Sequence, residues 1–164
     1  LEFFGSETET DLHKIIGNHC VFPSIGSNVI RKKLVELMEK QELNQLVVCH
    51  ASAVVSPSAS IAPSTLISAR AVINALAEIG KGCIINTSAV VEHECRIGDF
   101  SHIAPGAVLA GNVTIGENTF IGAGSVVKQG INVGSNAVIG AGSVVIRDIP
   151  DNETWAGNPA RRIK

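Results

Sequence analysis

Two histidines and three carboxylates lie close together between residues 91 and 102. The run Val91-Glu92-His93-Glu94-Cys95 is followed by Asp99 and His102, and no other histidine lies between residues 51 and 149. An imidazole with a pKa near 6.5 can accept a proton at neutral pH, and a neighbouring carboxylate stabilises the imidazolium. If only one of these residues were present, a solvated charged turn would explain it. Two histidines beside glutamates favour a site where an amine or hydroxyl loses its proton during attack on a carbonyl.

These residues lie inside a repeat of six residues. An aliphatic residue occupies every sixth position sixteen times without insertion, from Val55 through Ile103 to Val145, and a small or apolar residue follows four positions later. Neither a helical period of 3.6 nor strict alternation fits. Three six-residue units closing one triangular turn of a parallel β-helix do fit, with turns stacked about 4.8 Å apart. We predict a mainly β fold with this β-helix over residues 51–149, and with Cys83 and Cys95 as buried thiols.

The spacing of the two histidines has a geometric consequence in such a prism. His93 falls at a corner, and His102 lies nine residues later on an outward strand position, one and a half sides further round. At about 3.3 Å per strand residue, they are more than ~10 Å apart within one chain. If they act together, they must meet across a subunit boundary.

Residues 1–50 have a different pattern. A short β-like run at 22–25, the turn Gly26-Ser27-Asn28, an apolar-faced helix from there to about Lys40 and a strand at 46–49 read as a βαβ unit. Ser27 or Asn28 can cap the helix, and its N-terminus can hold a phosphate. We therefore predict a small, Rossmann-like α/β domain over 1–50, which either binds a nucleotide or only caps the β-helix. Residues 150–164 form a C-terminal tail.

Composition limits the choice of partners and compartment. The 164 residues are 45% hydrophobic and 4% aromatic, with a net charge of −2. This charge argues against nucleic acid or an anionic membrane as a partner. Without a long apolar run or a leader, we expect a cytoplasmic protein. The chain begins at Leu1 without an initiator Met, which is consistent with a start partway through a longer protein.

The repeat resembles the left-handed β-helix of the hexapeptide-repeat acyltransferases, an exception to right-handed crossovers. Residues 92–95 with Gly98 and His102 resemble the catalytic coil of the UDP-4-amino-4,6-dideoxy-sugar N-acetyltransferases. The resemblance implies a homotrimer that uses acetyl-CoA and no metal. It also implies that His93 is the general base, that Glu94 rather than Glu92 raises its basicity, and that His102 contacts the acetyl thioester.

A cofactor groove is implied by two further segments. Residues 121–127 recur almost unchanged at 139–145, eighteen residues later, so their Gly-Ala-Gly corners stack. In the resembled family the pantetheine arm of acetyl-CoA lies along such a groove, and the matching residues are Ala123 and Ala141. Gly-Asn-Pro-Ala followed by a base is a frequent ending in that family. Arg161 and Arg162 either pair with CoA phosphates or stay solvated.

The acceptor side is implied by residues 24–33, which are similar to the nucleotide-sugar-binding segment of bacterial sugar acetyltransferases, including the sialic acid O-acetyltransferase family. This similarity implies that Gly26, Ser27 and Asn28 bind substrate. Those proteins open with a Gly-rich turn, whereas this chain has Phe4-Gly5-Ser6. Either the first βα unit is absent from this sequence or the nucleotide site is reduced.

The expected function is acetyl transfer from acetyl-CoA to the amino group of a UDP-4-amino-4,6-dideoxy sugar, in glycan or cell-surface polysaccharide synthesis. A sialic acid hydroxyl is the alternative acceptor. A zinc hydratase resembling the γ-type carbonic anhydrases is a weaker alternative, because zinc needs about three protein ligands and the β-helix has two histidines without the HxxxxH spacing. A non-catalytic β-helix scaffold is a third interpretation.

Overall fold

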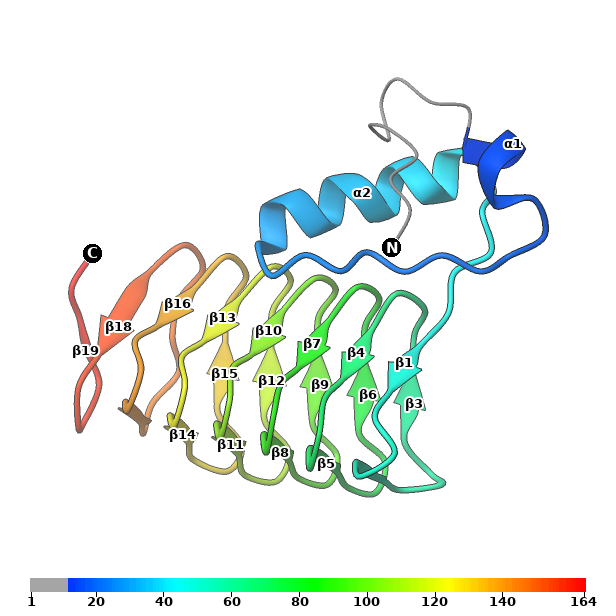
Figure 1. The fold of residues 1–164 in the computed structure, drawn as a ribbon. Coiled ribbons are helices and arrows are strands. Elements are labelled where there is room, and N and C mark those ends of the chain that lie inside the picture. Colours follow the sequence, from blue (N-terminus) through cyan, green and yellow to red (C-terminus); the bar gives the residue numbers. More distant parts are fainter. Residues whose placement is uncertain (1–11) are drawn as a thin grey trace.

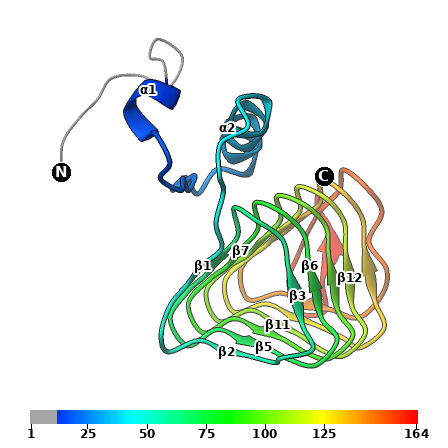
Figure 2. The same ribbon diagram turned by 90° about the vertical axis from the view of Figure 1, so that its right-hand side faces the viewer.

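The computed structural model describes residues 12–164, which form a triangular parallel β-solenoid with one long helix along a corner (Figures 1 and 2). Phe4-Gly5-Ser6 lies outside the described residues. Each turn of the solenoid passes through three sheets in the same order. As far as β17, every strand has two residues and pairs in parallel with strands eighteen residues away in the sequence.

The three sheets are named here in the order in which the chain meets them. Sheet 1 contains β1 (Val48–Cys49), β4 (Leu66–Ile67), β7 (Ile84–Ile85), β10 (His102–Ile103), β13 (Phe120–Ile121), β16 (Val138–Ile139), β18 (Thr154–Ala156) and β19 (Arg161–Arg162). Sheet 2 contains β2 (Val54–Val55), β5 (Val72–Ile73), β8 (Val90–Val91), β11 (Val108–Leu109), β14 (Val126–Val127) and β17 (Val144–Val145). Sheet 3 contains β3 (Ser60–Ile61), β6 (Glu78–Ile79), β9 (Arg96–Ile97), β12 (Thr114–Ile115) and β15 (Asn132–Val133).

The six-residue register predicted from the sequence is confirmed. The aliphatic residue is the second residue of each strand and points inward, and all sixteen except Val55 and Ile61 are buried. The small residues four positions later fill the rest of the interior, including the buried thiols of Cys83 and Cys95. Burial raises the pKa of Cys83 to about 12, so this thiol stays protonated and inert.

A residue with left-handed backbone closes each corner. Positive φ recurs every six residues from Ser64 to Gly142, and most of these residues are not glycine. Glu94 (φ 61°) and Phe100 (φ 61°) belong to this series. Such a conformation costs a non-glycine residue about 1–3 kcal/mol, so the stacked coils must hold it in place.

The N-terminal region differs from the expected Rossmann-like domain. Its described part contains α1 (Leu12–Ile16), α2 (Asn28–Lys40) and one isolated parallel bridge between Val21 and Gln45, but no sheet of its own. The predicted strand at 46–49 was assigned to the wrong sheet, because Val48 and Cys49 pair with β4 and begin the solenoid. Helix α2 lies along the corner between sheets 3 and 1 (Figure 2).

The C-terminal segment extends the solenoid instead of leaving it. β18 pairs in parallel with β16, and β19 turns back antiparallel to β18. The Asn158–Pro159 peptide bond in the turn between them is cis.

Candidate active site

His93 lies at the corner between sheets 2 and 3, in the turn that joins β8 to β9. The coils on either side fix this turn: the Asn112 N–H donates to the His93 carbonyl (2.8 Å), and the Glu94 N–H donates to the Ala75 carbonyl (2.9 Å). The backbone of the His93–Glu94 pair is therefore held in a rigid ladder, while both side chains point outward. Just over half of each side chain is exposed (52% and 57%).

The carboxylate partner of His93 is Glu94. His93 Nδ1 lies 3.0 Å from Glu94 Oε2, whereas Glu92 Oε2 accepts a hydrogen bond from the Asn74 side chain (2.8 Å). Because a carboxylate only accepts hydrogen bonds, Nδ1 carries the proton and Nε2 is left with a free lone pair. That tautomer is the one a general base requires.

Gly111 lies next to the imidazole on the following coil. A Cβ atom added to Gly111 would lie 2.5 Å from both Cε1 and Nε2 of His93. Any larger residue would therefore displace the ring. Sequence reasoning did not single out Gly111, although it lies eighteen residues after His93 and the coil register places the two residues side by side.

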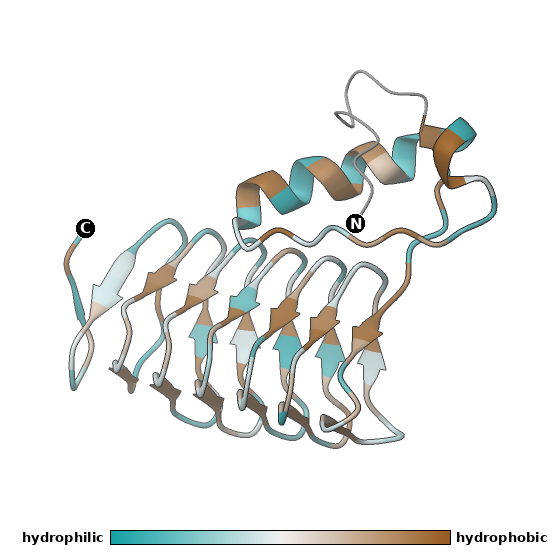
Figure 3. Ribbon diagram, in the orientation of Figure 1, coloured by the Kyte–Doolittle hydropathy of each residue, from teal (hydrophilic) through white to brown (hydrophobic). Residues whose placement is uncertain are grey.

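His102 is the first residue of β10 and points out of sheet 1, where β10 appears partly teal among brown strands (Figure 3). Its ring packs edge-on against Phe120, with centroids 5.1 Å apart. Nε2 lies 3.0 Å from Asn86 Nδ2, and Asn86 Oδ1 accepts the Thr87 N–H (2.8 Å). This arrangement makes Asn86 Nδ2 the donor and His102 Nε2 the acceptor, so Nδ1 carries the proton. Asn86 was missed because it follows two isoleucines at an ordinary corner position.

Burial makes His102 a neutral residue. Desolvation, and then the positive charge of Arg31, lower the pKa of His102 to about 4, while the Gly26 carbonyl acts in the opposite direction. Its Nδ1 is buried without a hydrogen-bond partner of good geometry. The group that faces the buried imidazole is therefore the Gly26 carbonyl, at a geometry short of a good hydrogen bond.

A cavity of about 210 Å³ lies between the N-terminal segment and sheet 1, next to His102. Residues 22–26 form one wall, and Leu66, Ile84, Asn86 and His102 form the other. Its walls are mainly apolar, and the side-chain polar groups of Asn86 and His102 lie together at one side. A larger open depression of about 380 Å³ on sheet 3 contains none of the predicted site residues.

One chain does not bring the two histidines together. His93 occupies the corner between sheets 2 and 3, which lies across the triangle from sheet 1, where His102 is located (Figure 2). This placement agrees with the separation expected from the spacing. A shared site would need a second copy of the chain.

The predicted cofactor residues lie at the corner between sheets 1 and 2. The Gly142 N–H donates to the Ala123 carbonyl (2.8 Å), so the two Gly-Ala-Gly corners are directly stacked. A Cβ on Gly122 would lie 2.5 Å from the Ala141 nitrogen, which explains the glycine. Arg161 and Arg162 form β19, and Arg162 Nη1 pairs with Glu153 Oε1 (3.0 Å). The roles of these residues in cofactor binding remain predictions.

The three predicted acceptor residues lie where α2 begins. Gly26 lines the cavity next to His102, and Ser27 is the N-cap of α2 without a side-chain capping bond. The Asn28 amide donates to the carbonyls of Asn118 and Thr119 (3.3 and 3.4 Å) and accepts from Arg31 (2.9 Å). The polar atoms of Asn28 are thus used within the chain. Substrate binding by this segment remains a prediction.

Residues 12–164 contain neither a metal-binding cluster nor a membrane-spanning helix. Within this range, no three His, Cys, Asp or Glu side chains lie close enough together to hold a metal ion. No helix in the same range has the length and apolar character to cross a bilayer.

Comparison with known proteins gives two family matches and several similar structures. Residues 76–111 match the bacterial transferase hexapeptide family (six repeats), and residues 112–147 match the hexapeptide repeat of succinyl-transferase. No curated protein sequence matches significantly. PerB from Caulobacter crescentus, solved in complex with CoA and GDP-perosamine, is 38% identical over 93% of this chain and 74% of its own, with a TM-score of 0.90.

Two further solved structures are similar. The acetyltransferase domain of PglB from Neisseria gonorrhoeae, in complex with acetyl coenzyme A, is 39% identical over 93% of this chain and 75% of its own (TM-score 0.89). WeeI from Acinetobacter baumannii is 34% identical over 88% of this chain and 71% of its own (TM-score 0.84). With this identity over nearly its whole length, the chain belongs to the hexapeptide-repeat sugar acetyltransferases.

Proposed function

We propose that the protein transfers an acetyl group from acetyl-CoA to the amino group of a nucleotide-linked amino sugar. The observation that carries this proposal is the similarity, over 93% of the chain, to PerB in complex with CoA and GDP-perosamine. The finer prediction from the sequence is a UDP-4-amino-4,6-dideoxy sugar as acceptor. Because PerB is bound to a GDP sugar, both nucleotides belong in the test.

His93 acts as the general base in this proposal. The amine nitrogen attacks the thioester carbonyl, and its proton passes to the free Nε2 of His93, while Nδ1–H remains bound to Glu94 at 3.0 Å. As the C–N bond forms, the C–S bond breaks, and the protonated imidazole returns its proton to the departing CoA sulfur. Base catalysis of this kind supplies about 10²–10⁴-fold, and positioning supplies much of the remainder.

The His102 cavity receives the reacting ends of the two substrates. The stacked corners at Ala123 and Ala141 hold the pantetheine arm, and the acetyl group reaches His102, which the pKa of about 4 keeps neutral at pH 7. The Nδ1–H of a neutral imidazole can donate to a carbonyl oxygen without competing with His93 for the proton. The sugar lies against residues 22–26, the opposite wall of the cavity.

Sheet 2 is the face through which three copies pack side by side. Its six outward positions are all valine, whereas the outward residues of sheet 3 are polar: Ser60, Glu78, Arg96, Thr114 and Asn132. The His93 corner borders sheet 2 on one side, and the Ala123–Ala141 corner borders it on the other. A head-to-tail contact through this face brings unlike corners of neighbouring copies together, as a shared site requires.

The direct test is an acetyl-CoA consumption assay with UDP- and GDP-linked 4-amino sugars, free sialic acid, and matched sugars that lack the amine. We expect turnover only with a nucleotide-linked amino sugar. Turnover with sialic acid alone would favour O-acetylation. If acetyl-CoA raises the melting temperature but no acceptor in the panel is acetylated, the proposed acceptor class is wrong.

A further inference from the structure

Arg31 is fully buried, and its partners connect the N-terminal segment to the solenoid. It lies on the first turn of α2, has an exposed fraction of 0%, and carries a charge that no carboxylate within hydrogen-bond reach offsets in the described residues. All five of its N–H groups donate. Nε donates to the Gly82 carbonyl (2.5 Å), Nη1 to the carbonyls of Ile25 and Gly26 (both 3.1 Å), and Nη2 to Asn28 Oδ1 (2.9 Å) and the Phe100 carbonyl (2.8 Å).

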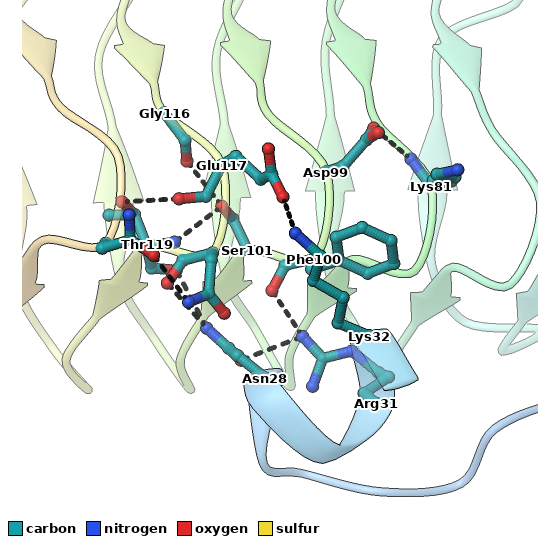
Figure 4. A network of polar contacts seen from close by, with 12 residues as sticks. Asn28, Arg31, Lys32, Lys81, Asp99, Phe100, Ser101, Gly116, Glu117 and Thr119 are labelled. Atoms are coloured by element: carbon teal, nitrogen blue, oxygen red, sulfur yellow. Dashed lines mark hydrogen bonds and ion pairs between the residues drawn. The ribbon is translucent and has the colours of Figure 1, made fainter. Parts of the chain in front are cut away.

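The solenoid carbonyls that accept these hydrogen bonds lie at equivalent positions of one corner. Gly82, Phe100 and Asn118 occupy the same position on three successive coils, eighteen residues apart, and each has a positive φ (60°, 61° and 57°). Arg31 binds the first two of these carbonyls, and the Asn28 amide binds the third. Figure 4 shows the contacts of Arg31 with Phe100 and with Asn28. Arg31 and Asn28 together therefore contact three coils at once.

The other two carbonyls belong to the wall of the His102 cavity. Ile25 and Gly26 both line that cavity, and the Gly26 carbonyl also influences the imidazole of His102. A single guanidinium thus fixes the distance between residues 25–26 and the coils that carry Gly82 and Phe100. His102 follows two residues after Phe100, so the same contact sets how closely this wall approaches the ring.

We propose that Arg31 is a positioning residue that, with Asn28, holds the N-terminal segment over His102 and so shapes the part of the cavity that receives the acceptor. This inference rests on the proposed function only for the identity of the acceptor. Lysine cannot replace Arg31, because an ammonium has three donors and no planar fork. The nearby ion pairs Lys32–Glu117 and Lys81–Glu39 attach α2 to the solenoid surface without contacting the cavity wall.

The key variant is Arg31→Lys, which keeps the charge and removes the geometry. Lys33→Ala, on the same helix, is the matched control. We expect Arg31→Lys to raise the KM for the amino sugar at least tenfold, with the KM for acetyl-CoA changed less than twofold. In Arg31→Ala, added guanidinium at millimolar concentration should restore part of the acceptor affinity, and methylammonium should not.

NMR titration of His102 gives a readout that does not depend on turnover. In Arg31→Lys the wall moves away, so water reaches the ring and the pKa of His102 rises from about 4 towards 6.5. Asn28→Ala removes one of the three coil contacts. It should raise the acceptor KM and the pKa of His102 as well, but by less than Arg31→Lys does. An unchanged acceptor KM and an unchanged titration in both variants would overturn the inference. If wild-type protein acetylates no amino sugar but the titration shifts, the proposed function fails and the positioning role stands.

Discussion

The imidazole of His93 is held by one neighbour, Glu94, and is given space by another, Gly111. Glu94 binds Nδ1 at 3.0 Å, and the absence of a side chain at Gly111 leaves room for Nε2 and Cε1. Glu94 also has the left-handed backbone of a corner residue (φ 61°). The coil register therefore places both residues that contact or border the proposed base.

Replacing His93 by alanine removes the proposed proton acceptor from an exposed corner and leaves the interior intact. We expect kcat to fall at least ~100-fold, with the melting temperature and the oligomeric state unchanged. Steady-state kinetics, thermal melting and size-exclusion chromatography provide the measurements. Turnover close to wild type would refute the assignment of His93 as the base.

Gly111→Ala tests the same site without removing any reactive group. Its Cβ would lie 2.5 Å from Nε2 of His93, so the ring must rotate away from its position. We expect kcat to fall about tenfold or more while acetyl-CoA still stabilises the protein against heating. Gly106→Ala is a useful comparison, because a Cβ there meets nothing within 4 Å, although its φ of 66° adds strain. Equal activity of Gly111→Ala and wild type would show that the ring position is unimportant.

At the scale of elements, the repeat determines almost everything in the solenoid. A period of six residues allowed the inward residues, the corners and the separation of His93 from His102 to be predicted, because each follows from position in the coil alone. The N-terminal region could not be predicted in the same way. The strand at 46–49 has a local pattern that suits either a βαβ unit or the first coil, and only its pairing with β4 distinguishes the two.

The contacts of Arg31 could not be predicted from the sequence either. Its sequence environment is that of an ordinary basic residue on a helix, and its acceptors are backbone carbonyls that carry no sequence signal. Only the docking of α2 on the corner brings these groups together. Composition and spacing therefore identified the proposed catalytic coil but missed Arg31, Asn86 and Gly111.

The packing of residues 22–26 against β10 should make stability depend on pH. The folded-state pKa of His102 is about 4, below its ordinary value of 6.5, so the unfolded chain binds more protons between these two pH values. The contribution is fully present above pH 6.5 and is lost as the pH falls towards 4. Urea unfolding from pH 7.5 to 4 should show a smaller loss of stability for His102→Gln than for wild type. Parallel curves would contradict this prediction.

At the scale of the whole molecule, the outer surface of sheet 2 is apolar and that of sheet 3 is polar. Val108 lies mid-column in sheet 2, and Thr114 occupies the equivalent place in sheet 3. We expect Val108→Glu to convert a trimer into monomers and to abolish activity, because it puts a charge into an apolar contact. Thr114→Glu should leave both unchanged. Light scattering coupled to size-exclusion chromatography checks both variants, and a monomeric wild type would rule out the proposed assembly.

Mixed trimers test whether the site is shared between copies. His93→Ala and His102→Ala protomers, purified together with different tags, should regain part of the activity that each lacks alone. Recovery follows because some interfaces then combine an intact His93 from one copy with an intact His102 from the next. No recovery, with mixed trimers confirmed by mass spectrometry, would refute a site built from two chains.

Because every coil as far as β17 has eighteen residues, the position of a residue in the coil decides which sheet it belongs to. Removing eighteen residues takes out one complete revolution and leaves every downstream side chain facing its original direction. Removing only six rotates everything downstream by a third of a revolution, so that the polar column of sheet 3 continues the valine column of sheet 2. The prism can therefore gain or lose length in whole revolutions, whereas smaller gains or losses within the coils would join the valine face to the polar face.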